Sequence, residues 1–205
     1  MNQAWLAALP LAWLLGSIPF SYLLPKWWAG RDVRTEGSGN VGATNAARTA
    51  GPWVGGLCVL LDAGKGALPI LVLQGFAAPP EMAPMAAACS VLGHGYPPWL
   101  KGIGGKGVAT TAGAVLALHP WAGGALLGAW LLLLALGRRV SVASVGAAVL
   151  LPGLMVLCPL PGSAPLPLGG LAFGVGAASW IVLRHRRNLS RLREGTEPMI
   201  GRKSA

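Results

Sequence analysis

Charge is scarce in this chain of 205 residues, of which only 11% are charged and only 6 are Asp or Glu. A soluble domain of this length would carry about 25% charged residues. Hydrophobic residues instead make up 54% of the sequence, and its mean hydropathy is +0.59. The shortage of charge argues against a water-soluble globular domain and predicts an integral membrane protein, whose main solvent is lipid.

Cysteine is also rare: Cys58, Cys89 and Cys158 all lie in apolar stretches. Their odd number and irregular spacing argue against a disulfide framework or a metal cluster, so we expect buried cysteines and no metal. The first residues lack the Lys or Arg that opens a cleavable signal peptide. The first apolar stretch is therefore expected to remain as a membrane span.

The apolar stretches predict an all-α polytopic membrane protein with about seven transmembrane helices. Several middle stretches are short or interrupted by proline, so about five complete spans with two partial ones would also fit. We expect one integral-membrane domain over residues 1–205. The stretches cover residues 3–24, 52–75, 81–96, 108–119, 121–137, 142–160 and 167–183.

Basic residues follow every second apolar stretch, whereas the intervening loops contain no Lys or Arg. The positive-inside rule places the basic loops in the cytoplasm, with the N-terminus outside and the C-terminus cytoplasmic. The net charge is +10, but the basic residues do not form one soluble face. We therefore expect membrane lipids and anionic substrates as partners, and no nucleic acid.

Two charged residues, Asp62 and Lys65, lie inside the second apolar stretch. A spacing of three residues on a helix brings them within pairing reach. Charges in the membrane interior tend to be paired and functional. Two interpretations stay open, an ion pair that locks the helix or a supporting wall of an active site.

Glycine pairs at small-xxx-small spacing predict close helix contacts in the bundle. The pairs are Gly51 with Gly55, Gly124 with Gly128, and Gly170 with Gly174.

Polar residues gather in a few segments on the predicted cytoplasmic side, the first being Gly37–Arg48. Its glycines permit unusual backbone angles and can form an anion-binding nest, and Arg48 adds a cation. The segment contains G-x-G-x-x-G, but a dinucleotide site needs a preceding strand, and a membrane span precedes it here. A flexible connector is the alternative. The candidate substrate-binding residues are Gly37, Ser38, Gly39, Asn40, Thr44, Asn45 and Arg48.

The second segment joins His94 to a Gly-Gly-Lys-Gly run. A Walker A site is excluded by Leu100 and Gly107, which occupy positions of a required glycine and a Ser or Thr. A lysine framed by glycines at the start of a helix still favours a phosphate, whereas a lone histidine is more often a packed residue. The candidates are His94, Gly104, Gly105 and Lys106.

Two further segments are strongly basic. Arg138 and Arg139 fit a positive-inside anchor, and Ser141 either caps the next helix or binds a ligand. In the C-terminal segment, His185, Asn188 and Arg191 would share one face of a helix. A tail that binds lipid headgroups is the alternative for that segment.

Taken together and in this order, these segments resemble the PlsY family, the bacterial acyl-phosphate:glycerol-3-phosphate acyltransferases. The resemblance covers nearly the whole chain. One departure is that Gly102 and Ile103 stand where the family has an aromatic and a basic residue, which Lys101 would compensate. The motifs that carry the resemblance are Gly16-Ser17-Ile18-Pro19, Gly37–Arg48, Asp62, Lys65-Gly66, His94–Thr110 and Arg184–Glu197.

The resemblance implies substrate contacts for Ser38 and Arg48, a phosphate contact for Lys106, and a pocket completed by His185 and Asn188. It also matches Ser141 to a family serine and places the enzyme, as a monomer, in the bacterial cytoplasmic (inner) membrane with its site facing the cytoplasm. The expected catalytic residues are Ser38, Lys106 and His185.

The implied reaction is direct acyl transfer from acyl phosphate to glycerol 3-phosphate. No cysteine or Ser-His-Asp set suggests a covalent acyl-enzyme, and a mixed anhydride needs no cofactor or metal to activate it. The base is His185, His94 or a substrate phosphate oxygen. A transporter for a phosphorylated solute would also need basic loops, but it predicts inverted repeats that this sequence lacks. A non-catalytic scaffold would leave the Asn and Ser residues of these segments unexplained.

Overall fold

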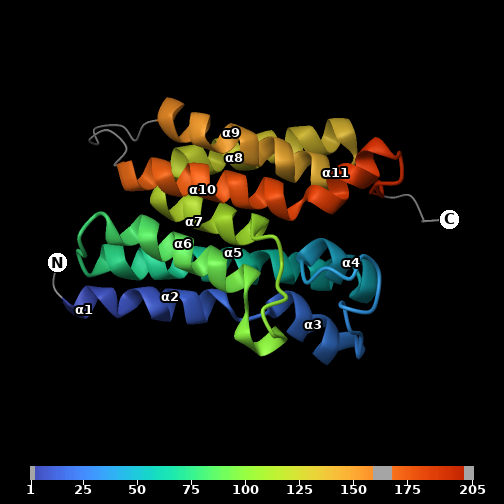
Figure 1. The fold of residues 1–205 in the computed structure, drawn as a ribbon, viewed down its shortest axis with the longest axis horizontal. Helices are drawn as coiled ribbons and strands as arrows, with labels where there is room; N and C mark the ends of the chain where they lie inside the picture. The colour runs from blue at the N-terminus through green and yellow to red at the C-terminus, as the bar shows by residue number, and fades with distance from the viewer. Residues whose placement is uncertain (1–2, 159–167, 201–205) are drawn as a thin grey trace. The chain divides into compact units, whose positions relative to one another are not determined.

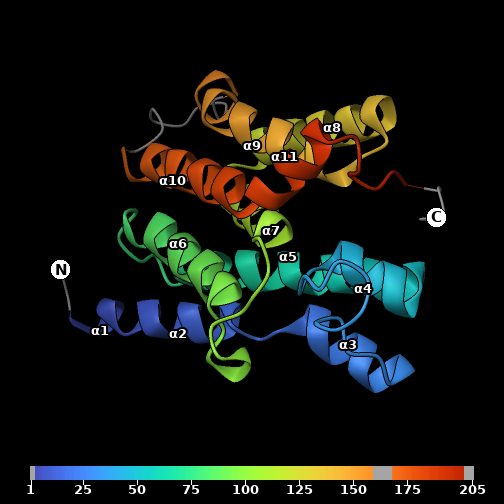
Figure 2. The same ribbon diagram turned by 45° about the vertical axis from the view of Figure 1, so that its right-hand side comes forward.

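The computed structural model describes residues 3–158 and 168–200, and every regular element in these ranges is a helix (Figures 1 and 2). Each predicted apolar stretch contains at least part of a helix, which confirms the all-α architecture. The helices are α1 (Gln3–Leu6), α2 (Ala8–Gly16), α3 (Phe20–Ala29), α4 (Ala43–Ala50), α5 (Pro52–Gly75), α6 (Met82–Gly95), the 3-10 helix η1 (Pro98–Leu100), α7 (Val108–Leu118), α8 (Pro120–Gly137), α9 (Val140–Leu157), α10 (Leu168–Arg184) and α11 (Arg186–Arg193).

The apolar helices differ in length. In the described ranges, 4 helical segments are long and apolar enough to cross a membrane. Helices α6, α7 and α10 are apolar but have only 14, 11 and 17 residues. The count of about seven crossings therefore stays a prediction, as does the orientation of the termini. The expected loop over residues 159–167 lies outside the described residues. The long segments are Ala8–Ala29, Pro52–Gly75, Pro120–Gly137 and Val140–Leu157.

The helices group into two compact units, Met1–Leu118 and His119–Ala205. In the first unit, α5 packs against α7, α4, α6 and α3, and α2 packs against α6. In the second unit, α9 packs against both α8 and α10 (Figure 2). The single domain expected over residues 1–205 stays a prediction.

The first apolar stretch is broken between α2 and α3. Helix α2 ends at Gly16, and α3 begins directly after Pro19, which has no N–H for the helical ladder. A side-chain carbon on Gly16 would overlap the backbone of Ser90 in α6. In return, a side-chain carbon on Gly93 of α6 would overlap the carbonyl oxygen of Trp13. Glycine on both helices therefore sets the close α2–α6 crossing beside the break.

A second close crossing joins α5 to α7. A side-chain carbon on Gly66 would overlap the Thr110 carbonyl of α7, and one on Gly113 would overlap the Ala63 carbonyl of α5. Close backbone approach between apolar helices is how small residues favour packing in lipid. The glycines at this contact thus hold α7, and the segment before it, against α5.

The small-xxx-small prediction was only partly right. Gly55 rests on Ala47 of α4, and Gly174 faces the Met155 sulfur. In contrast, a side-chain carbon on Gly124, Gly128 or Gly51 would meet no atom of residues 3–158 or 168–200 within 4 Å. Spacing alone therefore did not identify the glycines at the closest crossings.

Replacing Gly66 with alanine should destabilise the first unit by about 1–3 kcal/mol, because the Thr110 backbone cannot yield as a flexible side chain would. Gly64 is the matched control on the same helix, since an added side-chain carbon there meets no atom of the described part of the chain within 4 Å. Thermal unfolding of the detergent-purified variants measures the difference. Equal Tm values for Gly66→Ala and Gly64→Ala would contradict the packing argument.

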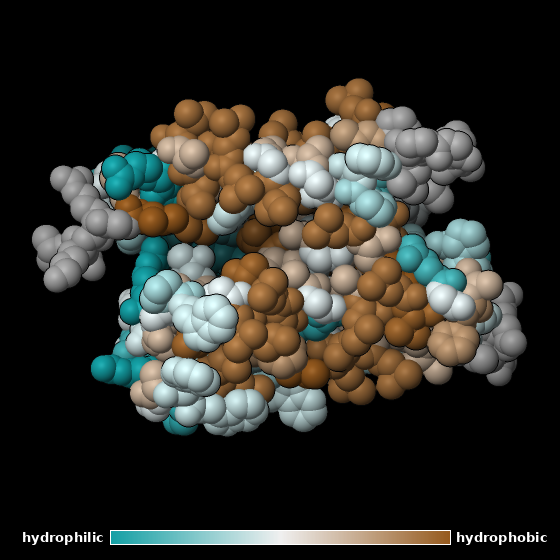
Figure 3. Space-filling model, turned by 180° about the vertical axis from the view of Figure 1, so that it is seen from behind, coloured by the Kyte–Doolittle hydropathy of each residue, from teal (hydrophilic) through white to brown (hydrophobic). Residues whose placement is uncertain are grey.

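Large hydrophobic side chains face outward on both units (Figure 3). Leu60 on α5 is 70% exposed and Leu136 on α8 is 76% exposed, which would be unfavourable in water. Exposed tryptophans add rings that favour the membrane–water interface. This surface fits lipid as the surrounding solvent. The exposed tryptophans are Trp27, Trp28, Trp53, Trp99 and Trp121.

Candidate active site

The loop over residues 33–42 is shaped by the side chain of Asn45. Asn45 is only 1% exposed, and its Nδ2 donates to the carbonyls of Val33 (2.8 Å) and Glu36 (3.0 Å). Its Oδ1 accepts the backbone N–H of Ser38 at 2.8 Å. An amide can make four such bonds. The hydrogen bonds of the Asn45 side chain therefore hold the loop backbone in place, and we assign Asn45 a positioning role.

The backbone of this loop uses glycine where the chain turns. Gly37 and Gly39 have φ values of +61° and +69°, which other residues rarely adopt. The N–H of Gly39 donates to Glu36, and that of Gly42 donates to Asn40. With the Ser38 N–H bound to Asn45, these donors are engaged inside the loop. The expected anion-binding nest is therefore not formed by these three N–H groups.

Side chains of the same segment remain accessible. Ser38 and Arg48 are exposed, and Asn40 and Thr44 are half-buried. Other cations of the loop are paired locally: Arg34 contacts Asp32 at 2.7 Å and holds its pKa at about 2, below its ordinary value. Ser38 and Arg48 are thus the groups of this segment best placed to meet a ligand.

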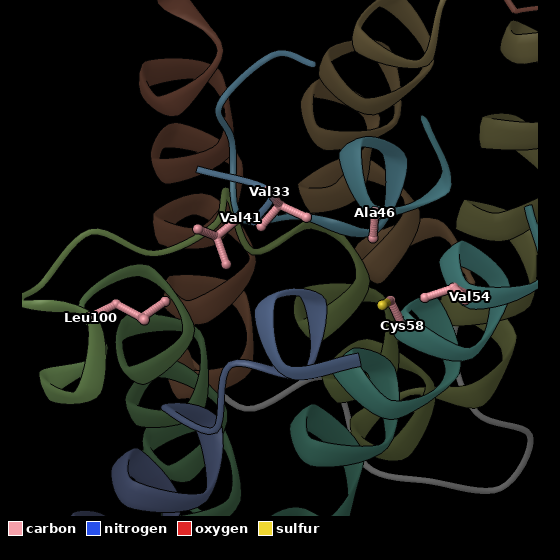
Figure 4. Close-up of a cluster of buried hydrophobic side chains, with 6 residues drawn as sticks. All are labelled: Val33, Val41, Ala46, Val54, Cys58 and Leu100. Carbon is pink, nitrogen blue, oxygen red and sulfur yellow. The ribbon is translucent and has the colours of Figure 1, made fainter. Parts of the chain in front are cut away.

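A cluster of buried apolar residues anchors the loop to the helices (Figure 4). Val33 and Val41 come from the loop, and Leu100 comes from η1. Ala46 of α4 and Val54 of α5 pack into the same cluster. Full burial of each valine or leucine side chain stabilises by about 1.5–3 kcal/mol. The cluster therefore ties both glycine-rich segments to α4 and α5.

The segment over residues 104–107 packs directly on the first loop. A side-chain carbon on Gly105 would overlap both the Val41 carbonyl oxygen and Nε2 of His94. The Gly105 N–H donates to the His94 carbonyl at 3.2 Å. A side-chain carbon on Gly104 would overlap the same carbonyl oxygen, and the Gly104 N–H donates to the Gly95 carbonyl. The two segments that the sequence separates by about sixty residues thus meet at Gly105.

Lys106 follows at the entry to α7, which begins at Val108. Gly107 has a φ of +82°, so the chain turns sharply between the lysine and the helix. Lys106 is half-buried. The predicted arrangement of a lysine beside the first turn of a helix is confirmed, and it concentrates positive potential at one point.

The predicted pairing of Asp62 and Lys65 is also confirmed. Lys65 Nζ lies 2.8 Å from Asp62 Oδ1, and both side chains are 2% exposed. A lone charge at this depth would be costly, and pairing offsets that cost.

In the second unit, Glu197 organises the C-terminal residues. Its Oε1 accepts from Asn188 Nδ2 at 2.8 Å, and its Oε2 accepts from Arg191 Nε at 2.8 Å. Asn188 and Arg191 thus share a face of α11, as the three-residue spacing predicted. The Glu197 carbonyl also accepts from Arg139 Nε at 3.4 Å. Sequence reasoning did not single out Glu197, although an acidic residue in a basic tail was a usable signal.

His185 stands at the start of α11 and is 3% exposed. Its Nδ1 lies 2.8 Å from the Ile181 carbonyl, which can only accept. Nδ1 therefore carries a proton, and the acid–base chemistry of the neutral ring resides on Nε2.

Ser141 lies in the first turn of α9 and not at its cap, because the helix begins at Val140. Its buried hydroxyl lies close to Glu197, but Oγ has no partner with good hydrogen-bond geometry among the described residues. Burial alone would raise the pKa of Glu197. The Ser141 dipole and the hydrogen bonds from Asn188 and Arg191 outweigh it and lower the pKa.

Replacing Glu197 with glutamine should lower the stability of the second unit at pH 7 by about 1.5–3 kcal/mol, through loss of charge-assisted hydrogen bonds. A carboxylate with a lowered folded pKa stabilises above its unfolded pKa of about 4.3 and loses this effect as pH falls through the folded value. The difference from the unmodified protein should therefore shrink below about pH 4. Thermal unfolding across pH measures it. Glu194→Gln is the control, since the one side-chain hydrogen bond of Glu194 among the described residues comes from an exposed Ser190 hydroxyl. A pH-independent deficit would contradict the assignment.

The structure thus collects the candidates in two sets. The first unit joins the loop of Ser38 to His94 and Lys106 through Gly105. The second unit joins Ser141, Asn188 and Arg191 around Glu197, with His185 one residue before α11. The expectation that both sets serve one site stays a prediction.

This chain is similar in sequence to known acyltransferases over nearly its whole length. Residues 6–195 match the family model described as Glycerol-3-phosphate acyltransferase. The Glycerol-3-phosphate acyltransferase of Thermotoga petrophila is 43% identical over 195 residues, which cover 93% of each chain. That of Synechococcus elongatus is 41% identical, over 94% of this chain and 93% of its own.

Solved structures of PlsY, an integral membrane glycerol 3-phosphate acyltransferase, share the fold. The glycerol 3-phosphate form has a TM-score of 0.88 and 36% identity, and the match covers 97% of this chain and 96% of that one. The lysophosphatidic acid form has a TM-score of 0.85 and 34% identity over the same shares. The motifs, the helical fold and these matches agree: this chain belongs to the glycerol-3-phosphate acyltransferase family and is an integral membrane acyltransferase of the PlsY type.

Proposed function

We propose that this enzyme transfers the acyl group of an acyl phosphate to the 1-hydroxyl of sn-glycerol 3-phosphate, which yields 1-acylglycerol 3-phosphate (lysophosphatidic acid) and phosphate. This reaction is an early step of phospholipid synthesis. The names of the relatives support glycerol 3-phosphate as the acceptor, and the two forms of PlsY support both acceptor and product. The donor rests on the family motifs and on the chemistry below.

The observation that carries the proposal is the contact at Gly105. It places the Lys106 turn against the loop that bears Ser38 and leads into α4, where Arg48 lies. Two phosphate groups brought together repel each other, and cations from both segments can offset that repulsion. Two cation-bearing segments in contact therefore fit a site that holds two phosphate groups.

The chemistry follows from the two substrates. The acceptor hydroxyl oxygen attacks the acyl carbonyl carbon, the bond from that carbon to the phosphate oxygen breaks, and inorganic phosphate leaves. The hydroxyl proton passes to a base, which is a histidine or a substrate phosphate oxygen. Ser38 and Lys106 provide donors for the negative charge that develops on the carbonyl oxygen and on the leaving phosphate. One such donor is typically worth about 10²–10³ in rate. The Nε2 atom of His185 can exchange a proton or bind phosphate.

The remaining candidates bind substrate in this proposal. Gly37, Gly39 and the half-buried Asn40 and Thr44 belong to the first loop. Ser141, Asn188 and Arg191 are held around Glu197 in the second unit. The donor's acyl chain would enter from the lipid, because hydrophobic side chains cover the outside of the helices.

We further propose the membrane arrangement that the basic loops predict. The chain is a monomer in the bacterial inner membrane, its C-terminus is cytoplasmic, and substrate enters from the cytoplasm. Labelling of single cysteines placed in the loops of residues 31–42 and 101–107 tests it. Both loops should react from the cytoplasmic side, and labelling of the two from opposite sides would overturn the proposal.

The decisive assay uses purified protein in lipid vesicles with acyl phosphate and glycerol 3-phosphate. Lysophosphatidic acid and inorganic phosphate should appear in equal amounts, acyl-CoA should not replace acyl phosphate, and EDTA should leave the rate unchanged. Acyl transfer from acyl-CoA alone would overturn the proposed donor. Uptake of glycerol 3-phosphate without product would favour the transporter alternative.

A further inference from the structure

The Asp62–Lys65 pair lies within one helix, so it cannot by itself join α5 to another element. Its partners outside α5 are therefore the informative ones. Lys65 Nζ donates to the Ile18 carbonyl at 2.7 Å, within the break between α2 and α3. Asp62 Oδ2 accepts the Ser21 hydroxyl of α3 at 2.7 Å. The pair thus holds the interrupted first span by two polar contacts.

The third partner of the pair comes from α6. His94 Nδ1 lies 3.7 Å from Asp62 Oδ1, and the ring is 8% exposed. A nearby carboxylate favours the tautomer with the proton on the facing nitrogen, so we assign the ring proton to Nδ1. Nε2 of the same ring lies against Gly105, whose N–H donates to the His94 carbonyl. His94 therefore connects Asp62 directly to the residue before Lys106.

We infer that Asp62 is a positioning residue that acts through His94 to hold the Gly104–Lys106 segment in its binding geometry. Lys65 balances the charge of Asp62, and Ser21 fixes its other oxygen. This inference rests on the proposed role of Lys106 as a phosphate contact. Of the two interpretations that the sequence left open, it selects the supporting wall of an active site over an ion pair that only locks the helix.

A purely stabilising role explains this arrangement less well. Buried ion pairs are often replaceable by packed apolar residues at no loss of stability, because desolvation offsets their attraction. Here the same carboxylate contacts α3 and approaches α6, and the α6 contact leads to the glycine segment. A fixed ring orientation is what a charge contributes and an apolar side chain does not.

The test compares Asp62→Asn with the double variant Asp62→Asn/Lys65→Met, which removes both charges and so avoids an unpaired buried lysine. Lys106→Met identifies which substrate the lysine binds, by the KM that it raises. The double variant should raise the same KM by about 10-fold and change kcat less, because misplacement of a binding group by about 1 Å has effects up to about 10². Gly64→Ala on the same helix is the control for general packing.

Addition of His94→Asn to the double variant should raise this KM little further, because both substitutions interrupt one connection. The comparison is restricted to KM, since His94 is also a candidate base and its loss could lower kcat. Independent, multiplying effects in folded protein would overturn the inference, as would an unchanged KM. The ¹⁵N signals of histidine provide a readout that stability alone does not move. The His94 signal, assigned by its loss in His94→Asn, should show a proton on Nδ1 that becomes shared between both nitrogens in the double variant.

The two proposals fail in different ways. If Lys106→Met alters neither KM, the phosphate role of Lys106 is wrong, while the ¹⁵N signal still reports the Asp62–His94 contact. If Lys106→Met raises one KM and the double variant does not, the role of Lys106 stands and the positioning role of Asp62 is wrong.

Discussion

Replacement of Lys106 by methionine is expected to lower kcat/KM by about 10- to 100-fold, because it removes charged hydrogen bonds worth about 1.5–3 kcal/mol at the phosphate. Lys106 stands between Gly105 and the turn into α7 at Gly107, which fixes the place of its ammonium group. Methionine keeps most of the length and apolar stem of lysine. Steady-state kinetics with both substrates varied measures the effect.

Lys101 provides the matched control for this charge. It is exposed, lies in the same inter-helical segment and has a left-handed backbone with a φ of +53°. If Lys106 acts through its position, Lys101→Met should change kcat/KM less than about 3-fold. Equal losses in the two variants would mean that only the general positive potential of the segment matters. In that case Lys101 would compensate for the missing basic residue at Ile103.

The helices and the Asp62–Lys65 pairing were predictable because they depend on neighbours in the sequence. Long apolar stretches must become helices in lipid to satisfy their backbone, and residues three apart on a helix must meet. The position of Lys106 beside the start of α7 was predictable for the same reason, because the glycines and the apolar stretch that set it are its sequence neighbours. The break between α2 and α3 at Pro19 was not predicted. The carbonyl of Ile18 in this break accepts a hydrogen bond from the Lys65 ammonium of α5, and such a contact between distant residues cannot be read from the local sequence.

The roles of individual polar residues were less predictable. Asn45 looks like a ligand-binding amide in the sequence, yet its hydrogen bonds close the loop around Ser38. Glu197 lies in a basic tail, and its importance appears only when Asn188 and Arg191 converge on it. Both cases depend on contacts between separate turns of the chain, although for Glu197 an acidic residue in a basic tail was a usable signal.

Gly105 is the residue whose substitution tests the meeting of the two segments most directly. Gly105→Ala should lower kcat/KM by about 100-fold or more, since a shift of about 1 Å in a positioning segment can have this effect. A side-chain carbon there would overlap the Val41 carbonyl on one side and the His94 ring on the other. The ring could move only by leaving Asp62, and the carbonyl belongs to a loop held by Asn45 and by the buried Val41 side chain.

The same overlap should lower the stability of the first unit by about 1–3 kcal/mol, so activity and thermal unfolding must be measured on the same detergent-purified samples. Ile103→Ala is the control, because Ile103 lies two residues away and is 67% exposed. A Gly105→Ala protein with unchanged Tm and unchanged kinetics would show that the segments do not touch at this residue. Arg48 and Lys106 would then not be held near each other by this contact. The proposed two-phosphate site would lose the contact at Gly105 on which it rests.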